Sequence, residues 1–167
     1  GIAVLNLDGI QTRYDHPAEV LEQISDAPPE EATKLVQSIY LKPVKEKLIA
    51  KRIREIKSKK VPAVVSCIPQ NAKKFADIAQ EAGCDIFVVQ STVATARHVA
   101  TEYKVLDISK FCQELKIPVI IGNSVTYEVA LELMESHASG LLIGIGPGSA
   151  CTSRGVFGSK HNGGFNN

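Results

Sequence analysis

The sequence predicts an α/β fold built around a parallel β-sheet, and three observations support this. Five short runs are almost continuously apolar, which is typical of strands buried on both faces of a sheet. Segments with helical periodicity lie between these runs. The last four runs recur at intervals typical of βα units. Strands that alternate with helices indicate parallel strands joined by right-handed crossovers.

The expected strands share a high content of apolar and β-branched residues, which favours extended backbone. In chain order they are Ile2–Leu7 (IAVLNL), Pro62–Ile68 (PAVVSCI), Asp85–Gln90 (DIFVVQ), Pro118–Asn123 (PVIIGN) and Leu141–Gly146 (LLIGIG).

The expected helices each place an apolar stripe on one face. The segment Pro29–Tyr40 opens with proline and acidic residues, as helix N-termini do. The segment Glu46–Lys57 lies in the basic stretch KEKLIAKRIREIKSKK, whose charges surround an apolar stripe and therefore indicate a solvated helix face. The remaining helices are expected at Ala72–Ala82 and Thr126–Met134.

Two architectures remain open from the residues alone: a doubly wound open sheet and a (β/α)8 barrel. Both bind ligands at the carboxyl ends of their strands. The segments after the five expected strands are NLDGIQ, CIPQN, QSTVAT, GNSVT and GIGPGSAC, and they hold most of the Asn, Gln, Ser and Thr outside the helices. The sequence therefore predicts a functional face at the carboxyl edge of the sheet.

Composition narrows the class of protein. The chain has 167 residues, which corresponds to one domain or part of one, and 44% are hydrophobic, which is ample for a core. A net charge of +1 argues against nucleic-acid and membrane partners. The four cysteines are widely spaced without a CxxC pair, which argues against a zinc site and favours reduced thiols in a cytoplasmic protein. No apolar run approaches the length of about 20 residues that spans a membrane.

The glycine-rich segment GIGPGS, residues 144–149, follows the last apolar run. It lacks the GK[ST] of a phosphate-binding P-loop, and its glycines alternate instead of following GxGxxG. Alternating glycines can direct successive amides or carbonyls into one concavity that holds an anion or a cation. A tight turn without a ligand explains the same residues equally well.

Cys151 lies just beyond these glycines. Oriented backbone amides and the nearby Arg154 would lower its pKa and make it nucleophilic. The alternative is a structural cysteine, which is the interpretation we adopt for Cys67, Cys84 and Cys112 because they fall in or beside apolar strands or in a helix.

The segment GIGPGSACTSR, residues 144–154, closely resembles the active-site loop of the IMP dehydrogenase and GMP reductase family. The segment IIGNSVT is similar to the one after the fifth barrel strand of that family, and NLDGIQTRYDHP and VVQST resemble a short branch that lacks CBS domains. The resemblance implies a partial (β/α)8 barrel over residues 1–154, with strands two to six present. Residues 155–167 (GVFGSKHNGGFNN) do not resemble the family's continuation, and we expect a divergent, disordered tail on a fragment of the parent protein.

The resemblance also implies a chemistry. Cys151 matches the nucleophile that attacks carbon 2 of IMP, hydride leaves to NAD, and water releases XMP from the covalent intermediate, in guanine nucleotide biosynthesis. Ser153 retains a hydroxyl where many relatives have a catalytic-loop threonine. Ser149 matches a phosphate-binding residue, and Asn123 matches a residue near the substrate.

Two further sites follow from the same resemblance. The carbonyls of Gly146, Gly148 and Cys151 match those that hold a monovalent cation, usually potassium. Gln90 and Ser91 stand on the nicotinamide ribose side, where many relatives have an aspartate in the place of Gln90.

Two alternatives remain at this point. One is a GMP reductase, which uses NADPH and the same cysteine, and the other is a non-catalytic remnant. We expect the complete parent to be a homotetramer, and we expect the 167 residues alone to lack steady turnover.

Overall fold

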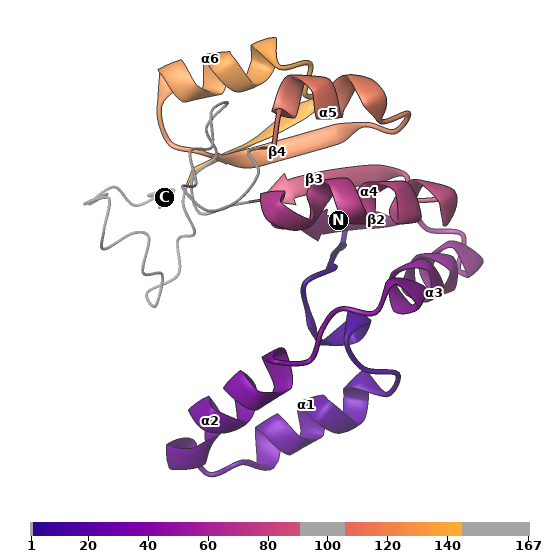
Figure 1. The fold of residues 1–167 in the computed structure, drawn as a ribbon, viewed down its shortest axis with the longest axis vertical. Helices are drawn as coiled ribbons and strands as arrows, with labels where there is room; N and C mark the ends of the chain where they lie inside the picture. Colours follow the sequence, from indigo (N-terminus) through magenta and orange to yellow (C-terminus); the bar gives the residue numbers. More distant parts are fainter. Residues whose placement is uncertain (1, 91–105, 145–167) are drawn as a thin grey trace, which may run out of the picture.

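The computed structural model describes residues 2–90 and 106–144, and these form a five-stranded parallel sheet (Figure 1). Its strands are β1 (Val4–Asn6), β2 (Val64–Cys67), β3 (Ile86–Gln90), β4 (Val119–Ser124) and β5 (Gly140–Ile143). All neighbouring pairs are parallel. The five expected strands are therefore confirmed, although residues 145–146 of the last expected run lie outside the described residues.

Six α-helices and one 3-10 turn connect the described strands. They are η1 (Ile10–Thr12), α1 (Pro17–Asp26), α2 (Pro29–Tyr40), α3 (Glu46–Ser58), α4 (Pro69–Glu81), α5 (Ile108–Glu114) and α6 (Tyr127–Glu135). The four expected helices are confirmed, and α2 has the expected bounds. Helix α4 begins earlier than expected because Pro69 occupies its first turn, where a missing N–H costs nothing.

Neither α1 nor α5 was assigned bounds from the sequence, although Cys112, which lies in α5, was expected in a helix. Helix α1 follows His16 and has Pro17 at its start. Helix α5 is only seven residues long, and the side chain of Asp107 accepts a hydrogen bond from the amide of Lys110 at its N-terminus. Such a short helix has too few turns to show a clear periodicity.

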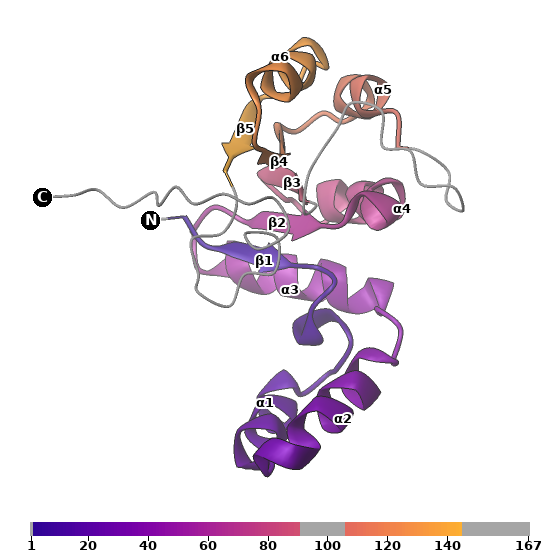
Figure 2. The ribbon, with the colours of Figure 1, turned by 90° about the vertical axis from the view of Figure 1, so that its left-hand side faces the viewer.

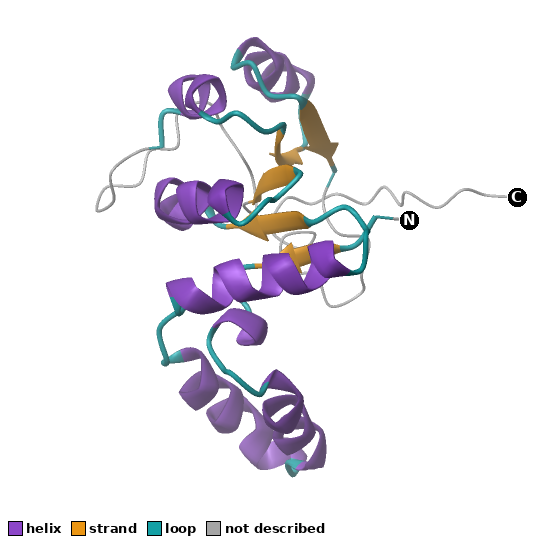
Figure 3. Cartoon of the chain, turned by 90° about the vertical axis from the view of Figure 1, so that its right-hand side faces the viewer, coloured by secondary structure: helices purple, strands orange, loops and turns teal. Residues whose placement is uncertain are grey.

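The strand order decides between the two architectures. Each strand lies beside the next one in the chain, in the order β1-β2-β3-β4-β5, with no reversal. Helices α3, α4, α5 and α6 all lie on one face of the sheet (Figures 2 and 3). A doubly wound sheet has helices on both faces and a switch point in its strand order. The chain is therefore part of a (β/α)8 barrel, as expected from the resemblance.

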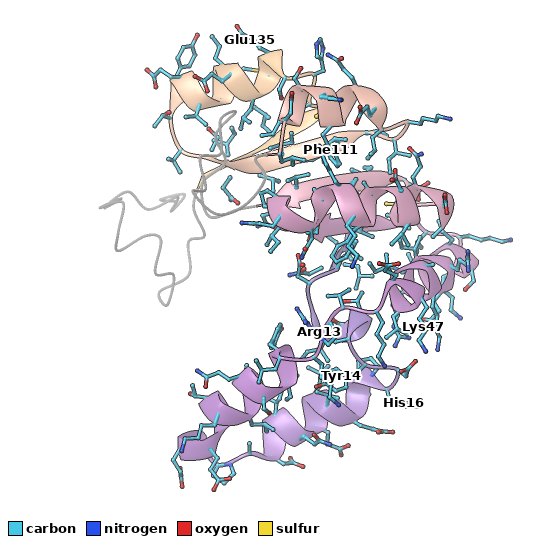
Figure 4. All side chains as sticks on the ribbon, in the orientation of Figure 1. Arg13, Tyr14, His16, Lys47, Phe111 and Glu135 are labelled. Atoms are coloured by element: carbon cyan, nitrogen blue, oxygen red, sulfur yellow. The ribbon has the colours of Figure 1, made fainter. Side chains whose placement is uncertain are left out.

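The main core lies between the sheet and these four helices. Val65, Phe87 and Ile121 point from the strands into this layer and are almost fully buried. Phe111 lies on α5 (Figure 4). Its ring packs against that of Phe87, with centroids 5.9 Å apart. Strand β2 is buried at all four positions, as expected for a strand covered on both faces. Strands β1 and β5 are more exposed because each has only one neighbour in the described sheet.

Helices α1 and α2 form a hairpin that projects away from the sheet (Figure 1). The hairpin has a small core of its own, made by Val20 and Ile39 with Ile10 of the preceding turn. Two arginines attach the start of this unit to the rest of the molecule. Arg13 donates to the backbone carbonyl of Asp8, before η1, and Arg52 of α3 donates to those of Gln11, in η1, and Tyr14, after it.

Candidate functional site

Two of the expected site residues, Gln90 and Asn123, lie at the carboxyl edge of the sheet. Gln90 is the last residue of β3 and pairs with Gly122 of β4. Asn123 follows directly on β4, so the two amide side chains lie on neighbouring strands at the same edge. Gln90 is exposed and Asn123 is half-buried. Both are therefore placed where strand ends of this fold meet a ligand.

Asn123 holds the residue at which the glycine-rich segment begins. Its side-chain Nδ2 donates to the carbonyl of Gly144 at 2.9 Å. The amide of Gly144 donates to the carbonyl of Ser124 at 2.7 Å. Gly144 has φ +100°, in the left-handed region that favours glycine. Both polar backbone groups of Gly144 are thus bonded to β4, which fixes where the chain leaves β5.

Gly122 allows β4 and β5 to approach closely beneath this point. A Cβ built on Gly122 would lie 2.7 Å from the carbonyl oxygen of Leu142 and 3.0 Å from its Cα. Backbone atoms cannot move aside as a flexible side chain can. A glycine at this position is therefore required for the observed pairing of the two strands.

The other end of the same edge holds a residue that the sequence did not single out. Asp8, just after β1, accepts hydrogen bonds from the amide of Ile68 and the side chain of Asn71. Ile68 connects β2 to α4, and Asn71 lies in the first turn of α4. The only sequence signal was that NLDGIQ is one of five polar segments after strands, which gave Asp8 no individual role.

The remaining expected site residues lie outside the described residues. They are Ser91, Gly146, Gly148, Ser149, Cys151 and Ser153. Their roles as cofactor-binding residue, cation ligands, phosphate-binding residue and catalytic residues stay predictions.

The three described cysteines are suited to a structural role. Burial raises the pKa of Cys67 far above its usual value, and burial raises the pKa of both Cys84 and Cys112 to about 11. These thiols stay protonated at neutral pH, where a nucleophile must be a thiolate. Within residues 2–90 and 106–144, no three His, Cys, Asp or Glu side chains are grouped so that they could hold a metal ion.

Among the described residues, no helix combines the length and the apolar character that crossing a membrane requires.

The amino-acid sequence is similar to proteins of one enzyme family. A family model described as the IMP dehydrogenase / GMP reductase domain matches residues 28–162. An uncharacterized oxidoreductase of Mycolicibacterium smegmatis is 31% identical over 158 residues, which are 92% of this chain and 42% of that protein. An inosine-5'-monophosphate dehydrogenase of Cryptosporidium parvum is 37% identical over 95 residues, which are 57% of this chain and 22% of that protein.

The fold agrees with a solved structure. An IMP dehydrogenase/GMP reductase-like protein from Corynebacterium glutamicum superposes with a TM-score of 0.79 at 29% identity, over 87% of this chain and 39% of that one. The chain thus spans less than half the length of these relatives. The family model, the fold and the geometry of the strand ends agree, and the chain belongs to the IMP dehydrogenase / GMP reductase family of oxidoreductases.

Proposed function

We propose that the protein containing this sequence is an NAD-dependent IMP dehydrogenase that forms XMP through a covalent intermediate on Cys151. The observation that supports this most directly is the bonding of Gly144 to β4 through Asn123 and Ser124. Gly144 is the residue after which the segment with Cys151 continues, and these two hydrogen bonds hold it at the carboxyl edge of the barrel. Barrel enzymes bind and convert their substrates at this edge.

The proposed reaction proceeds in two steps. The thiolate of Cys151 adds to carbon 2 of the purine, a sulfur–carbon bond forms, and the hydrogen of carbon 2 leaves as hydride. Water then attacks the same carbon, the sulfur–carbon bond breaks, and XMP, the thiolate and one proton are released. Covalent catalysis of this kind replaces one difficult step by two easier ones.

NAD, when bound, accepts the hydride. Gln90 fits a role beside it, because its exposed side-chain amide at the end of β3 can donate to and accept from ribose hydroxyls. Ser91 is proposed to assist Gln90. Ser149 is proposed to bind the nucleotide phosphate, Ser153 to assist Cys151 through its hydroxyl, and the carbonyls of Gly146, Gly148 and Cys151 to hold potassium. Cytoplasmic location and a homotetramer of the complete protein belong to the same proposal.

GMP reductase is the second candidate. The matching family model describes both activities. Gln90 also lacks the charge that many dehydrogenases place at this position. In that case Cys151 would attack carbon 2 of GMP, ammonia would leave, and NADPH would supply hydride to give IMP.

Turnover by a protein in which this sequence continues through a complete barrel tests the two candidates. We expect NADH to form from IMP and NAD, and NADPH to remain unconsumed with GMP. Consumption of NADPH with GMP, without formation of NADH from IMP and NAD, would identify the protein as a GMP reductase. The Cys151→Ala variant should lose turnover in either case, and near-normal turnover of this variant would refute the mechanism.

A chemical probe tests the nucleophile without turnover. 2-Chloro-IMP has a leaving group on the carbon that the thiolate attacks, so attack forms a sulfur–carbon bond and releases chloride. We expect peptide mass spectrometry to find the adduct on Cys151 and not on Cys67, Cys84 or Cys112. An adduct on one of the other three cysteines alone would contradict the assignment.

A further inference from the structure

Asp8 links the carboxyl ends of two neighbouring strands. Its Oδ2 accepts a hydrogen bond from the amide of Ile68 at 2.8 Å, and its Oδ1 accepts one from Nδ2 of Asn71 at 2.5 Å. Asp8 follows β1, whereas Ile68 and Asn71 lie where β2 ends and α4 begins. One carboxylate therefore holds the backbone of the neighbouring loop in place.

This loop has no side chain of its own that could do the same. The N-cap residue of α4 is Ile68, whose apolar side chain cannot accept a hydrogen bond, and Pro69 follows it. A carboxylate beside the start of a helix is favoured because it accepts hydrogen bonds from free N–H groups and carries the charge that complements the helix dipole. Asp8 thus serves α4 as an acceptor supplied from another strand.

The backbone of Asp8 is itself fixed from both sides. Its amide donates to Oδ1 of Asn6 at 2.8 Å. Its carbonyl accepts two hydrogen bonds from the guanidinium of Arg13, at 3.2 Å from Nε and 3.1 Å from Nη2. The backbone position from which the carboxylate reaches Ile68 and Asn71, which we call the β2–α4 loop, is therefore fixed.

Arg13 extends these contacts to the helical hairpin. Its Nη1 donates to the carbonyls of Tyr40 and Lys42, where α2 ends. The guanidinium also lies 5.3 Å from the centroid of the Tyr40 ring. Figure 4 places Arg13 at the junction between the hairpin and the sheet. A continuous set of hydrogen bonds thus joins the end of α2, Arg13, Asp8 and the β2–α4 loop.

We propose that Asp8 is a positioning residue of the candidate site, which sets the β2–α4 loop beside Gln90 and couples this loop through Arg13 to the hairpin. The residue acts on the ligand through the loop and not by touching it. Strand β2 is the direct neighbour of β3, on which Gln90 stands, so a displaced loop alters the surface next to Gln90. The inference deepens the proposed function and rests on it for the nature of the ligand.

Exchanging the side chains of Asp8 and Asn71 tests the two hydrogen bonds that the Asp8 carboxylate accepts. In Asp8→Asn the new amide oxygen can still accept from Ile68, but its NH2 group then faces the NH2 group of Asn71. The double variant Asp8→Asn with Asn71→Asp restores a donor opposite an acceptor. Asp15→Asn is the matched control, because Asp15 is an exposed carboxylate in the same part of the chain that pairs with Lys45.

The first measurement needs no nucleotide. Amide hydrogen exchange of Ile68, followed by NMR on the 167-residue chain, should accelerate roughly tenfold in Asp8→Asn, because a neutral acceptor replaces a charged one and the bond from Ile68 becomes weaker. The side-chain amide resonances of Gln90 should shift, while those of Asn123, two strands from β2, should not. The double variant should return both signals towards wild type.

The second measurement is the affinity for IMP of a protein in which this sequence continues through a complete barrel, compared between wild type and the same three variants. We expect Asp8→Asn to weaken binding about tenfold, the double variant to recover most of it, and Asp15→Asn to match wild type. Failure of wild type to bind IMP would count against the proposed function. The role of Asp8 would then still be decided by the exchange rate of the Ile68 amide and by the side-chain resonances of Gln90. Unchanged exchange at Ile68, or a lower unfolding temperature with wild-type Gln90 resonances and affinity, would overturn the inference.

Discussion

Asp85 joins three segments through one side chain. Its carboxylate accepts hydrogen bonds from Nζ of Lys57 at 2.7 and 2.9 Å and from the amide of Ala63 at 2.7 Å. These contacts connect the last turn of α3, the start of β2 and the start of β3. The hydrogen bond from Lys57, together with that from Ala63, holds the pKa of Asp85 below its usual value.

We expect Asp85→Asn to lower the free energy of unfolding by about 1 kcal/mol at pH 7, a small effect because the ion pair is exposed to solvent. A carboxylate with a depressed pKa stabilises the fold above its unfolded pKa of about 3.9, and this contribution is lost as the pH falls through the folded pKa. Denaturant unfolding of both proteins from pH 7 to pH 3 checks this. Curves that stay equally far apart at pH 3 would contradict it.

The cysteines allow a test of reactivity at single residues. Burial raises the pKa of Cys84 and of Cys112 to about 11 and disfavours the thiolate of Cys67 still more. We expect iodoacetamide at pH 7.5 to label Cys151 well before these three, as measured by peptide mass spectrometry over time. Labelling of Cys84 should stay slow below pH 9 because its thiol remains protonated. Equal labelling rates at all four cysteines would contradict the distinction between a reactive Cys151 and three structural cysteines.

Strands β4 and β5 form the element on which the candidate site rests. A Cβ at Gly122 would meet the backbone of Leu142, whereas one at Gly140 would meet only the Ile120 side chain, at an ordinary 3.4 Å. We expect Gly122→Ala to lower the free energy of unfolding by about 2 kcal/mol, because overpacking against backbone separates the strands. Gly140→Ala is the matched control and should change it by less than about 1 kcal/mol.

Thermal and denaturant unfolding measure both variants. Gly122→Ala should also shift the side-chain amide resonances of Asn123, whose partner Gly144 follows β5 directly. Equal free energies of unfolding for Gly122→Ala and Gly140→Ala would contradict this prediction, because β5 could then move away from β4 without loss of stability.

The sheet as a whole has two strands with one neighbour each among the described residues, β1 and β5. Large apolar side chains are exposed on both: Val4 is 50% and Ile143 is 69% exposed. Unpaired strand edges with exposed apolar residues promote association between chains. A closed barrel of eight strands has no such edges.

We therefore expect the 167-residue chain to associate as its concentration rises, which light scattering and sedimentation velocity can measure. Lysine at both strands, in the double variant Val4→Lys with Ile143→Lys, should reduce the association because a charge on an edge strand opposes pairing. Leu41→Lys is the matched control, since Leu41 is 83% exposed but lies just beyond α2 on the hairpin. Association that responds equally to both substitutions would point to general hydrophobic contact instead of strand edges.

The sequence by itself determined the local elements and their class. Continuous apolar runs such as Pro62–Ile68 and the apolar stripe of Glu46–Lys57 are properties of neighbouring residues, so strands and long helices could be predicted from them. The family followed from the segment 144–154, whose glycine and cysteine pattern is specific even without a structure. The bounds of helix α5, around the expected helical residue Cys112, were missed because seven residues capped by Asp107 carry too little periodicity.

Only the tertiary structure decided the relations between distant segments. The choice between barrel and open sheet depended on strand order and on the face that the helices cover, which apolar runs do not encode. The hydrogen bond from Asn123 to Gly144 and the contacts of Asp8 with Ile68 and Asn71 join residues 21, 60 and 63 positions apart. Such pairings arise when parallel strands bring their carboxyl ends to one edge, and a linear pattern of residues holds no record of that proximity.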